Sequence, residues 1–193
     1  MNMKILGVGI DLLDISRIAN LYAKYGSRLT DKILSNEELL SFEEIDLMQK
    51  KVNFIAKRFS AKEAFLKAVG IGMGRGIGLR DMTITKNQLG QPVIVLNEVA
   101  MGFLEWFYTP TLSSLPPALS SSRMRGSHEV ITTAWDPRDK PKDDRVGDED
   151  DSLCGNKKNS GFAIDTKSLT FSISVTDQGN FVNSIATIQG NDV

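Results

Sequence analysis

Apolar residues alternate with small or polar ones along the first part of the chain, from Lys4 to Leu13. A period of two places Leu6, Val8, Ile10 and Leu12 on one face of a strand and Ile5, Gly7, Gly9 and Asp11 on the other. From about Asp14 the apolar residues recur at intervals of three or four, which predicts a helix. The pattern therefore predicts a strand that leads directly into a helix, with Asp11 near the junction.

The strongest helical pattern spans residues 52–69. Its apolar stripe has spacings of three, four and seven and consists of Ile55, Phe59, Leu66 and Val69. Gly70 follows at the position where glycine commonly ends a helix. Glycine then occupies every second position as far as Gly78, which carries too high an entropic cost for a helix. We predict a long helix that ends in a glycine-rich loop.

Shorter elements surround this helix. Ser35 and Glu38 have the spacing of a capping box, which predicts a helix from there to about Glu43. Residues 82–85 and 93–96 form a predicted hairpin, and residues 98–106 a short helix. Near the C-terminus, a second predicted hairpin pairs residues 171–176 with residues 181–188.

The composition changes between these two hairpins. Residues 108–166 are first rich in serine and proline and then strongly charged, with little apolar periodicity. Such a segment buries too little apolar surface to offset the entropy of ordering. We predict that residues 108–166 form a disordered or irregular insertion within one domain made of residues 1–107 and 167–193.

Charge and cysteine content exclude several classes of protein. The net charge is −1, so nucleic acid is not an expected partner of the molecule as a whole. The single cysteine excludes an intramolecular disulfide and a cysteine-rich zinc site. No apolar run approaches the roughly 18 residues of a membrane span, and we expect no membrane association and no secretory signal. These features favour a cytoplasmic protein.

Glu63 interrupts the apolar stripe of the long helix, because it lies four residues after Phe59 and three before Leu66. A carboxylate on that face is unfavourable unless it is paired or bound to a metal. An ion pair with Lys67, four residues on, would satisfy it and is a common arrangement on helices. Taken alone, Glu63 leaves both interpretations open.

Asp11 ends the first strand on the face that carries Gly7 and Gly9, where two missing side chains leave room for a ligand or another backbone. The alternative is an aspartate that caps the helix starting near Asp14. Together with Glu63, however, Asp11 fits a magnesium site. Magnesium is typically held by one or two carboxylates, with substrate phosphates and water completing its shell.

The glycine-rich loop and its basic neighbours suit a phosphate group. Glycines let backbone N–H groups approach phosphate closely, and Lys62, Lys67 and Arg75 lie in or near the loop. The loop is not a Walker motif, because no Gly-Lys-Ser/Thr follows, and it is not a dinucleotide fingerprint, because it follows a helix. A plain flexible connection with solvated basic residues is the alternative.

Two segments carry a resemblance to a known family. They are Gly7–Ile18 (GVGIDLLDISRI) and Phe54–Ala68 (FIAKRFSAKEAFLKA), and the second runs into the glycine loop. In this order and spacing they resemble the holo-acyl-carrier-protein synthases, the small class of phosphopantetheinyl transferases. The resemblance covers roughly residues 4–106 and 168–190. It implies an α+β fold with an antiparallel sheet and packed helices, a transferase domain of residues 1–107 and 167–193, and a homotrimer.

The resemblance also implies a reaction. It moves 4′-phosphopantetheine from coenzyme A to a serine of an apo acyl carrier protein, in support of fatty acid synthesis. Asp11 and Glu63 match the family's magnesium ligands, so the metal would bridge the pyrophosphate of the coenzyme. Lys62 would stabilise the leaving phosphate, and Glu63 or a metal-ordered water would take the serine proton.

The resemblance assigns binding roles to a further set of residues. Lys67 matches a lysine at the coenzyme A site, and Gly70, Gly72 and Gly74 match the loop beside the phosphates of the coenzyme. Arg17, with Lys24 and Arg28, matches basic residues that contact the acidic carrier protein.

Three alternatives to the transferase remain. One is a catalytically impaired coenzyme A-binding protein whose insertion disrupts trimer assembly. The second is a nucleotide hydrolase, against which the missing Walker motif argues. In the third, the insertion itself is a partner-binding module.

Overall fold

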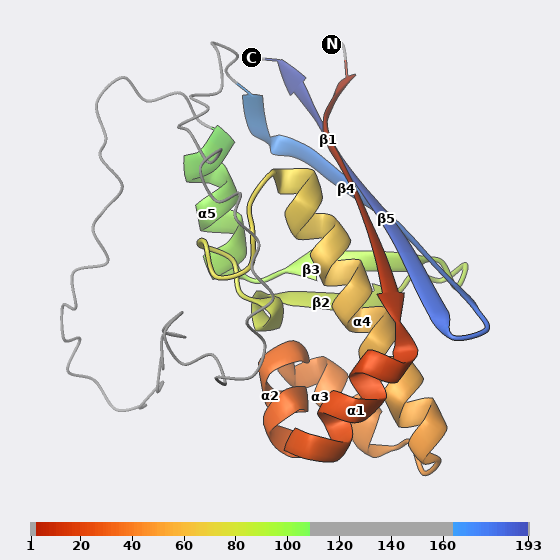
Figure 1. Cartoon of the computed structure of the whole chain (residues 1–193). Coiled ribbons are helices and arrows are strands. Elements are labelled where there is room, and N and C mark those ends of the chain that lie inside the picture. The colour runs from red at the N-terminus through yellow and green to blue at the C-terminus, as the bar shows by residue number, and fades with distance from the viewer. Residues whose placement is uncertain (1–2, 109–163, 193) are drawn as a thin grey trace, which may run out of the picture. The chain divides into compact units, whose positions relative to one another are not determined.

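A sheet of three antiparallel strands, in the order β1-β5-β4, forms the platform of the fold (Figure 1). The computed structural model describes residues 3–108 and 164–192. The N-terminal strand β1 (Met3–Asp14) and strand β4 (Ile164–Gln178) flank the C-terminal strand β5 (Phe181–Asp192). The two ends of the chain are therefore joined in one sheet. Of the predicted insertion, residues 109–163 lie outside the described residues. Its predicted bounds are too wide, because residue 108 ends a helix and residues 164–166 belong to β4.

Four helices follow β1. They are α1 (Ile15–Tyr25), α2 (Ser27–Ile33), α3 (Asn36–Glu43) and α4 (Met48–Val69). The predicted capping box begins α3: Ser35 Oγ accepts from Glu38 N, and Glu38 Oε2 accepts from Ser35 N. Helix α4 starts before the predicted position and ends at Gly70, whose φ of 85° is in the left-handed region that glycine adopts readily. Helix α2 was not predicted.

The middle of the chain completes the fold. After the glycine loop come a short 3₁₀ turn, η1 (Leu79–Asp81), the hairpin of β2 (Met82–Lys86) and β3 (Pro92–Leu96), and helix α5 (Glu98–Tyr108). The predicted hairpins and the predicted short helix are thus confirmed, and so is the α+β class. None of the described helices is long and apolar enough to cross a membrane.

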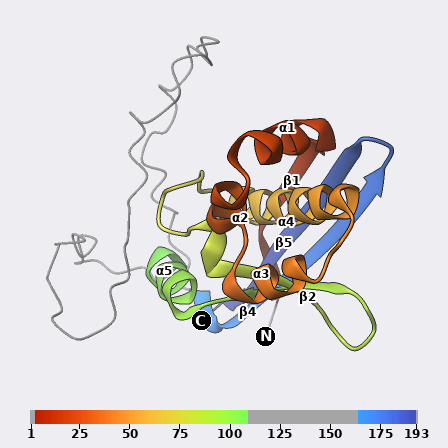
Figure 2. The same cartoon turned by 90° about the horizontal axis from the view of Figure 1, so that it is seen from below.

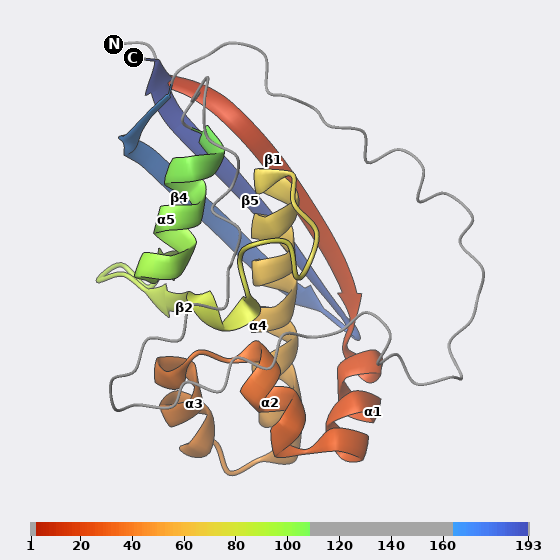
Figure 3. The same ribbon diagram turned by 90° about the vertical axis from the view of Figure 1, so that its left-hand side faces the viewer.

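Helix α4 is the central element of the core. Its C-terminal half packs with β2, β3, α5 and the sheet, in a cluster that includes Phe65, Met82 and Leu104. Its N-terminal half packs with α1, α2 and α3 in a second cluster that includes Ile18 and Ile55. Figure 3 shows α1, α2 and α3 gathered around the N-terminal half of α4, and Figure 2 shows α4 between α1 and α3.

Helix α4 packs against one face of the sheet. Within the described part of the chain, the opposite face of the sheet is uncovered. Its apolar residues on β1 are Val8, Ile10 and Leu12, which are 52 %, 57 % and 67 % exposed. Ile185 of β5 pairs directly with Ile10 and is also exposed. The predicted alternation is present from Val8 to Leu12, but this apolar face is not part of the core. It is wrong at the start of β1, where the register shifts, Ile5 is exposed and Leu6 packs against the core. An exposed apolar surface of this kind indicates an interaction site.

Candidate active site

Two glycines bring the first strand unusually close to the central helix. A Cβ atom at Gly7 would lie 1.9 Å from the carbonyl oxygen of Ala68, and one at Gly9 would lie 2.0 Å from that of Ala64. Any side chain at either position would therefore clash with the backbone of α4. Of the two interpretations of the space beside Asp11, a ligand or another backbone, the structure supports the backbone.

This close approach places Asp11 of β1 beside Glu63 and Lys67 of α4. Lys67 Nζ donates to Asp11 Oδ1 at 2.8 Å, so the ion pair of Lys67 joins the helix to the strand. The alternative pairing of Lys67 with Glu63 is not what the structure shows. Asp11 is not the helix cap either, because the side chain of Asp14 accepts from Ser16 N and caps α1.

The two carboxylates interact and have unused oxygens. Asp11 Oδ2 and Glu63 Oε1 are buried and have no hydrogen-bond partner. Burial raises the pKa of Glu63, and the negative charge of Asp11 raises it further, while Lys67 acts in the opposite direction. Two neighbouring carboxylates with unpaired oxygens attract a cation.

The chemistry of these groups fits magnesium. The described residues contain no cluster of three or more His, Cys, Asp or Glu side chains suited to a metal. Magnesium does not require such a cluster, because it commonly binds one or two carboxylates and takes its remaining oxygens from phosphate and water. Asp11 Oδ2 and Glu63 Oε1 are the oxygens that would hold it.

The glycine loop begins one turn beyond Lys67. Gly70 donates its N–H back to the carbonyl groups of Leu66 and Lys67 and so ends α4. Gly72 and Gly74 are exposed in the loop that follows. At Gly76 the loop lies against α5: φ is 110°, and a Cβ atom there would lie 2.0 Å from the ring of Phe103. The loop is thus anchored by a helix end on one side and by an aromatic ring on the other.

A cationic hollow lies on the N-terminal half of α4. Its volume is about 250 Å³, and it is lined by Lys50, Asn53, Phe54, Lys57 and Arg58. The guanidinium carbon of Arg58 lies 3.4 Å from the centre of the Phe54 ring, and Arg58 Nε is buried without a hydrogen-bond partner. Burial lowers the pKa of Arg58.

Comparison with known proteins identifies the family. The model of the 4′-phosphopantetheinyl transferase superfamily matches residues 7–114, more than half of the chain. The holo-[acyl-carrier-protein] synthase of Anaplasma phagocytophilum is 41 % identical over 97 residues, which are 50 % of this chain and 80 % of the relative. The chain belongs to the 4′-phosphopantetheinyl transferase superfamily.

Solved structures agree with this transferase fold. The crystal structure of the holo-ACP synthase from Plasmodium yoelii has a TM-score of 0.61 at 18 % identity, over 99 % of each chain. The Helicobacter pylori synthase in complex with coenzyme A has a TM-score of 0.54 at 17 % identity, over 94 % of this chain and 98 % of that one. At these identities the likeness concerns the fold alone.

The position of Lys62 requires a correction. Its side chain is 0 % exposed, and its ammonium donates to the carbonyl oxygen of Ile33 at 2.7 Å and to Glu38 Oε2 at 2.5 Å. An ammonium that is enclosed and paired in this way does not reach a bound phosphate. The expectation that Lys62 of this transferase stabilises the leaving phosphate is therefore wrong for this structure, and Lys67, which is half exposed, is the lysine at the carboxylates.

Sequence reasoning missed Glu38 as a partner of Lys62. The residue was recognised only for its local role in the capping box. One signal for the burial of Lys62 was present: it lies three residues after Phe59 and four before Leu66, on the same apolar stripe. Its partner lies 24 residues away in sequence, and no spacing rule identifies such a pair.

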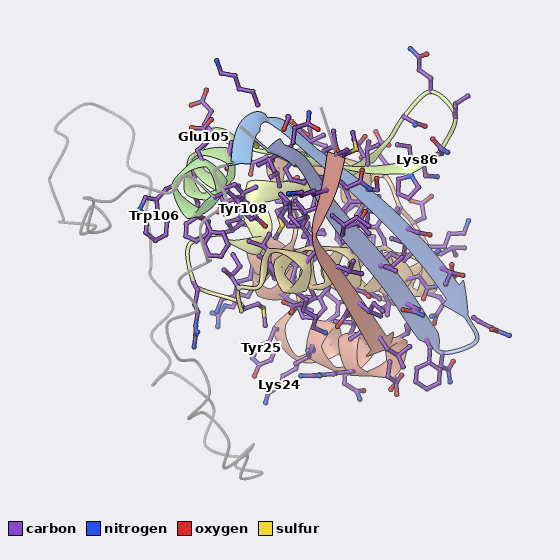
Figure 4. All side chains as sticks on the ribbon, turned by 90° about the horizontal axis from the view of Figure 1, so that it is seen from above. Lys24, Tyr25, Lys86, Glu105, Trp106 and Tyr108 are labelled. Carbon is purple, nitrogen blue, oxygen red and sulfur yellow. The ribbon has the colours of Figure 1, made fainter. Side chains whose placement is uncertain are left out.

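The predicted carrier-binding residues lie on the first two helices. Arg17 and Lys24 are exposed on α1, and Arg28 is exposed on α2. Lys24 Nζ lies 5.2 Å from the centre of the Tyr25 ring. Figure 4 shows Lys24 on the opposite side of the transferase domain from Lys86. These three cations lie on helices that follow directly from the strand carrying Asp11.

Proposed function

We propose that this transferase moves 4′-phosphopantetheine from coenzyme A to a serine of an apo acyl carrier protein, with magnesium, in support of fatty acid synthesis in the cytoplasm. The observation that carries this proposal is the pair of interacting carboxylates, Asp11 and Glu63, held beside Lys67 and the glycine loop. The single cysteine supports the cytoplasmic location.

The residues of the site divide the work as follows. Asp11 and Glu63 would hold magnesium, which would supply positive charge to neutralise the charge developing on the pyrophosphate. Lys67 contacts the same phosphates, because its side chain is half exposed and its ammonium lies at the carboxylates. The serine oxygen attacks the phosphorus nearest the pantetheine and forms a new P–O bond. The bond from that phosphorus to the bridging oxygen of the pyrophosphate breaks, and adenosine 3′,5′-bisphosphate leaves. Glu63, or a water beside it, would accept the serine proton.

Coenzyme A occupies the surface around this site. The Helicobacter pylori synthase has coenzyme A bound, which supports the same substrate for this chain. Gly70, Gly72 and Gly74 let the loop backbone approach a phosphate closely. The cationic hollow suits another phosphate of the coenzyme, since Lys50, Lys57 and Arg58 line it.

The test is mass spectrometry of an apo acyl carrier protein incubated with this protein, coenzyme A and magnesium. We expect the carrier to gain one phosphopantetheine, and the gain to disappear with a chelator and with Asp11→Asn. Binding of coenzyme A by the folded protein without any transfer would instead favour the catalytically impaired alternative. If the folded protein neither binds coenzyme A nor transfers phosphopantetheine, both the transferase and the catalytically impaired alternative are excluded.

The carrier protein docks on α1 and α2. Replacing Arg17 with glutamate should raise the KM for the carrier by about tenfold, because it reverses a charge that attracts an acidic partner. The KM for coenzyme A should stay unchanged, and added salt should narrow the difference between the variant and the wild type. Steady-state kinetics with varied carrier measure these effects.

Lys86→Glu is the matched control, since Lys86 is exposed on the side away from α1 (Figure 4). An equal rise in KM for the carrier in both variants would mean that overall charge, and not the α1 surface, determines carrier binding.

The active form is a homotrimer that buries the open face of the sheet. This proposal is supported by four apolar residues that lie exposed together on that face, Val8, Ile10, Leu12 and Ile185, because such a patch marks an interaction site. Replacing Ile10 with lysine should shift the protein from trimer to monomer, since the interface would then enclose an unpaired charge. Light scattering after gel filtration measures the mass.

Leu89→Lys is the control for this substitution, because Leu89 lies in the β2–β3 turn and is 83 % exposed. A trimer that persists in Ile10→Lys, or a monomeric wild type, would contradict the proposed interface.

A further inference from the structure

Lys62 and Glu38 form a fully enclosed ion pair next to the candidate active site. Lys62 is 0 % exposed and Glu38 is 2 % exposed. The Lys62 ammonium donates to Glu38 Oε2 and to the carbonyl oxygen of Ile33, near the C-terminal end of α2. A single lysine of α4 is thus bonded to both α2 and α3.

Glu38 extends this connection to the β2–β3 hairpin. Its Oε1 accepts from Ile84 N at 2.8 Å, while its Oε2 also accepts from Ser35 N at 2.9 Å. Beside it, Thr83 Oγ1 donates to Ser35 Oγ at 2.9 Å. Glu38 and Lys62 therefore join α2, α3, α4 and β2 at one buried point.

Stability alone is a weak reason for such a pair. Enclosing two charges carries a large desolvation penalty, and replacing a buried pair with uncharged residues of similar size is often neutral or stabilising. The two bonds from Lys62 to α2 and α3, with Glu38 itself anchored to β2, do, however, define the rotation and the height of α4 more narrowly than apolar packing does. A buried polar group can act in this way as a specificity device.

Glu63 is the residue that depends on this rotation. It follows Lys62 directly, so it points about 100° further around the helix, toward β1. Its Oε1 has no hydrogen-bond partner that would hold the side chain against Asp11. Its position relative to Asp11 is therefore set by the helix that carries it.

We propose that the Glu38–Lys62 pair positions Glu63 against Asp11 by fixing α4, so that the two are positioning residues for the reaction and not merely contributors to stability. The proposal rests on the proposed function for its effect on catalysis. Its structural part, the placement of Glu63, stands independently of that function.

The test uses the double variant Glu38→Gln/Lys62→Met in the full chain. It removes both charges together, so it leaves no uncompensated buried ion and is expected to fold. Glutamine at position 38 keeps one acceptor oxygen, which can serve Ser35 N in the capping box, and it gives up the second, which accepts from Ile84 N. We expect Mn²⁺, used as a probe for the magnesium site and followed by electron paramagnetic resonance, to bind about tenfold more weakly, and kcat to fall by about tenfold or more. The KM for coenzyme A should change little.

Glu37→Gln/Lys32→Met is the matched control. It makes the same chemical changes at exposed neighbours on α3 and α2 and removes the same charges. We expect wild-type Mn²⁺ binding and kcat from it. Equal losses in both double variants would mean that charge, and not positioning, is responsible, and would overturn the proposal.

A crystal structure of Glu38→Gln/Lys62→Met separates this proposal from the proposed function. We expect α4 to rotate or shift so that the carboxylates of Glu63 and Asp11 move apart. Unchanged positions, or wild-type Mn²⁺ binding and kcat, would overturn the positioning role. A wild-type protein that neither binds Mn²⁺ nor transfers phosphopantetheine would refute the proposed function, and the crystal structure would still decide the placement of Glu63.

Discussion

Glu63→Gln should lower the rate of phosphopantetheine transfer by about a thousandfold, since a metal ion supplies several kcal/mol of charge stabilisation and each 1.4 kcal/mol corresponds to roughly tenfold in rate. Glutamine has nearly the same shape as glutamate, but it lacks the negative charge that would hold magnesium beside Asp11. The mass-spectrometric transfer assay, run as a time course, measures the rate.

The same substitution should not destabilise the protein in the absence of magnesium. Burial and the charge of Asp11 raise the pKa of Glu63 in the folded state, so its ionised form is less stable there than in the unfolded chain. The resulting loss of stability begins as the pH rises above the pKa of Glu63 in the unfolded chain, and it is complete above the raised pKa of the folded state. Neutral glutamine avoids it. We therefore expect a midpoint of thermal unfolding equal to or above that of the wild type.

Magnesium should then reverse the order of stability. Adding it should raise the unfolding midpoint of the wild type, because a ligand that binds only the folded state stabilises that state, and it should leave Glu63→Gln unchanged. Glu105→Gln is the control, as Glu105 lies exposed on α5 (Figure 4). A folded Glu63→Gln protein that transfers at near-wild-type rates would refute the role of Glu63.

Asp11 and Glu63 could be chosen as candidate site residues from the sequence because each breaks a local pattern. The strand containing Asp11 and the helix containing Glu63 were both recognisable from periodicity, which reflects how backbone geometry repeats along the chain. A carboxylate on the apolar stripe, and one beyond two glycines, stand out against such repeats. The sequence did not indicate that Lys67 pairs with Asp11 at 2.8 Å, because that contact spans 56 positions.

Lys62 shows where this reasoning fails. A motif match places a lysine next to Glu63, and a basic residue beside a candidate phosphate site invites a catalytic role. Neighbouring residues on a helix point in different directions, however, and here the direction of Lys62 leads to Glu38. Its burial depends on the packing of α2 and α3, and α2 was itself not predicted. The apolar stripe indicates that Lys62 faces the core, but no local pattern identifies the partner that it meets there.

The open face of the sheet shows a second feature that the sequence does not predict, namely what covers an apolar face. Val8, Ile10 and Leu12 alternate as the sequence predicts, but alternation identifies an apolar face without saying what covers it. The described part of the chain leaves that face exposed. What covers the opposite face is explained by Gly7 and Gly9, because their missing side chains let α4 pack directly against β1.

Gly9→Ala should cause the largest loss of stability among the substitutions considered. Its Cβ atom would lie 2.0 Å from the carbonyl oxygen of Ala64 and 2.4 Å from the backbone nitrogen of Ala68. These are backbone atoms of a buried helix, so α4 would have to move away from β1. We expect the free energy of unfolding to fall by about 3 kcal/mol, at the upper end of the usual range for overpacking. Urea denaturation measures this change.

The same movement should separate Glu63 from Asp11 and lower the transfer rate of the remaining folded protein by about a hundredfold, as a displacement of about 1 Å can do. Gly102→Ala is the matched control: Gly102 lies within α5 with no atom near its missing Cβ, so alanine should stabilise by roughly 0.5–1 kcal/mol. If Gly9→Ala unfolds at a lower urea concentration but its folded fraction transfers phosphopantetheine at the wild-type rate, the close approach of β1 and α4 serves stability only. A loss of both would tie the glycines of the first strand to the geometry of the carboxylates.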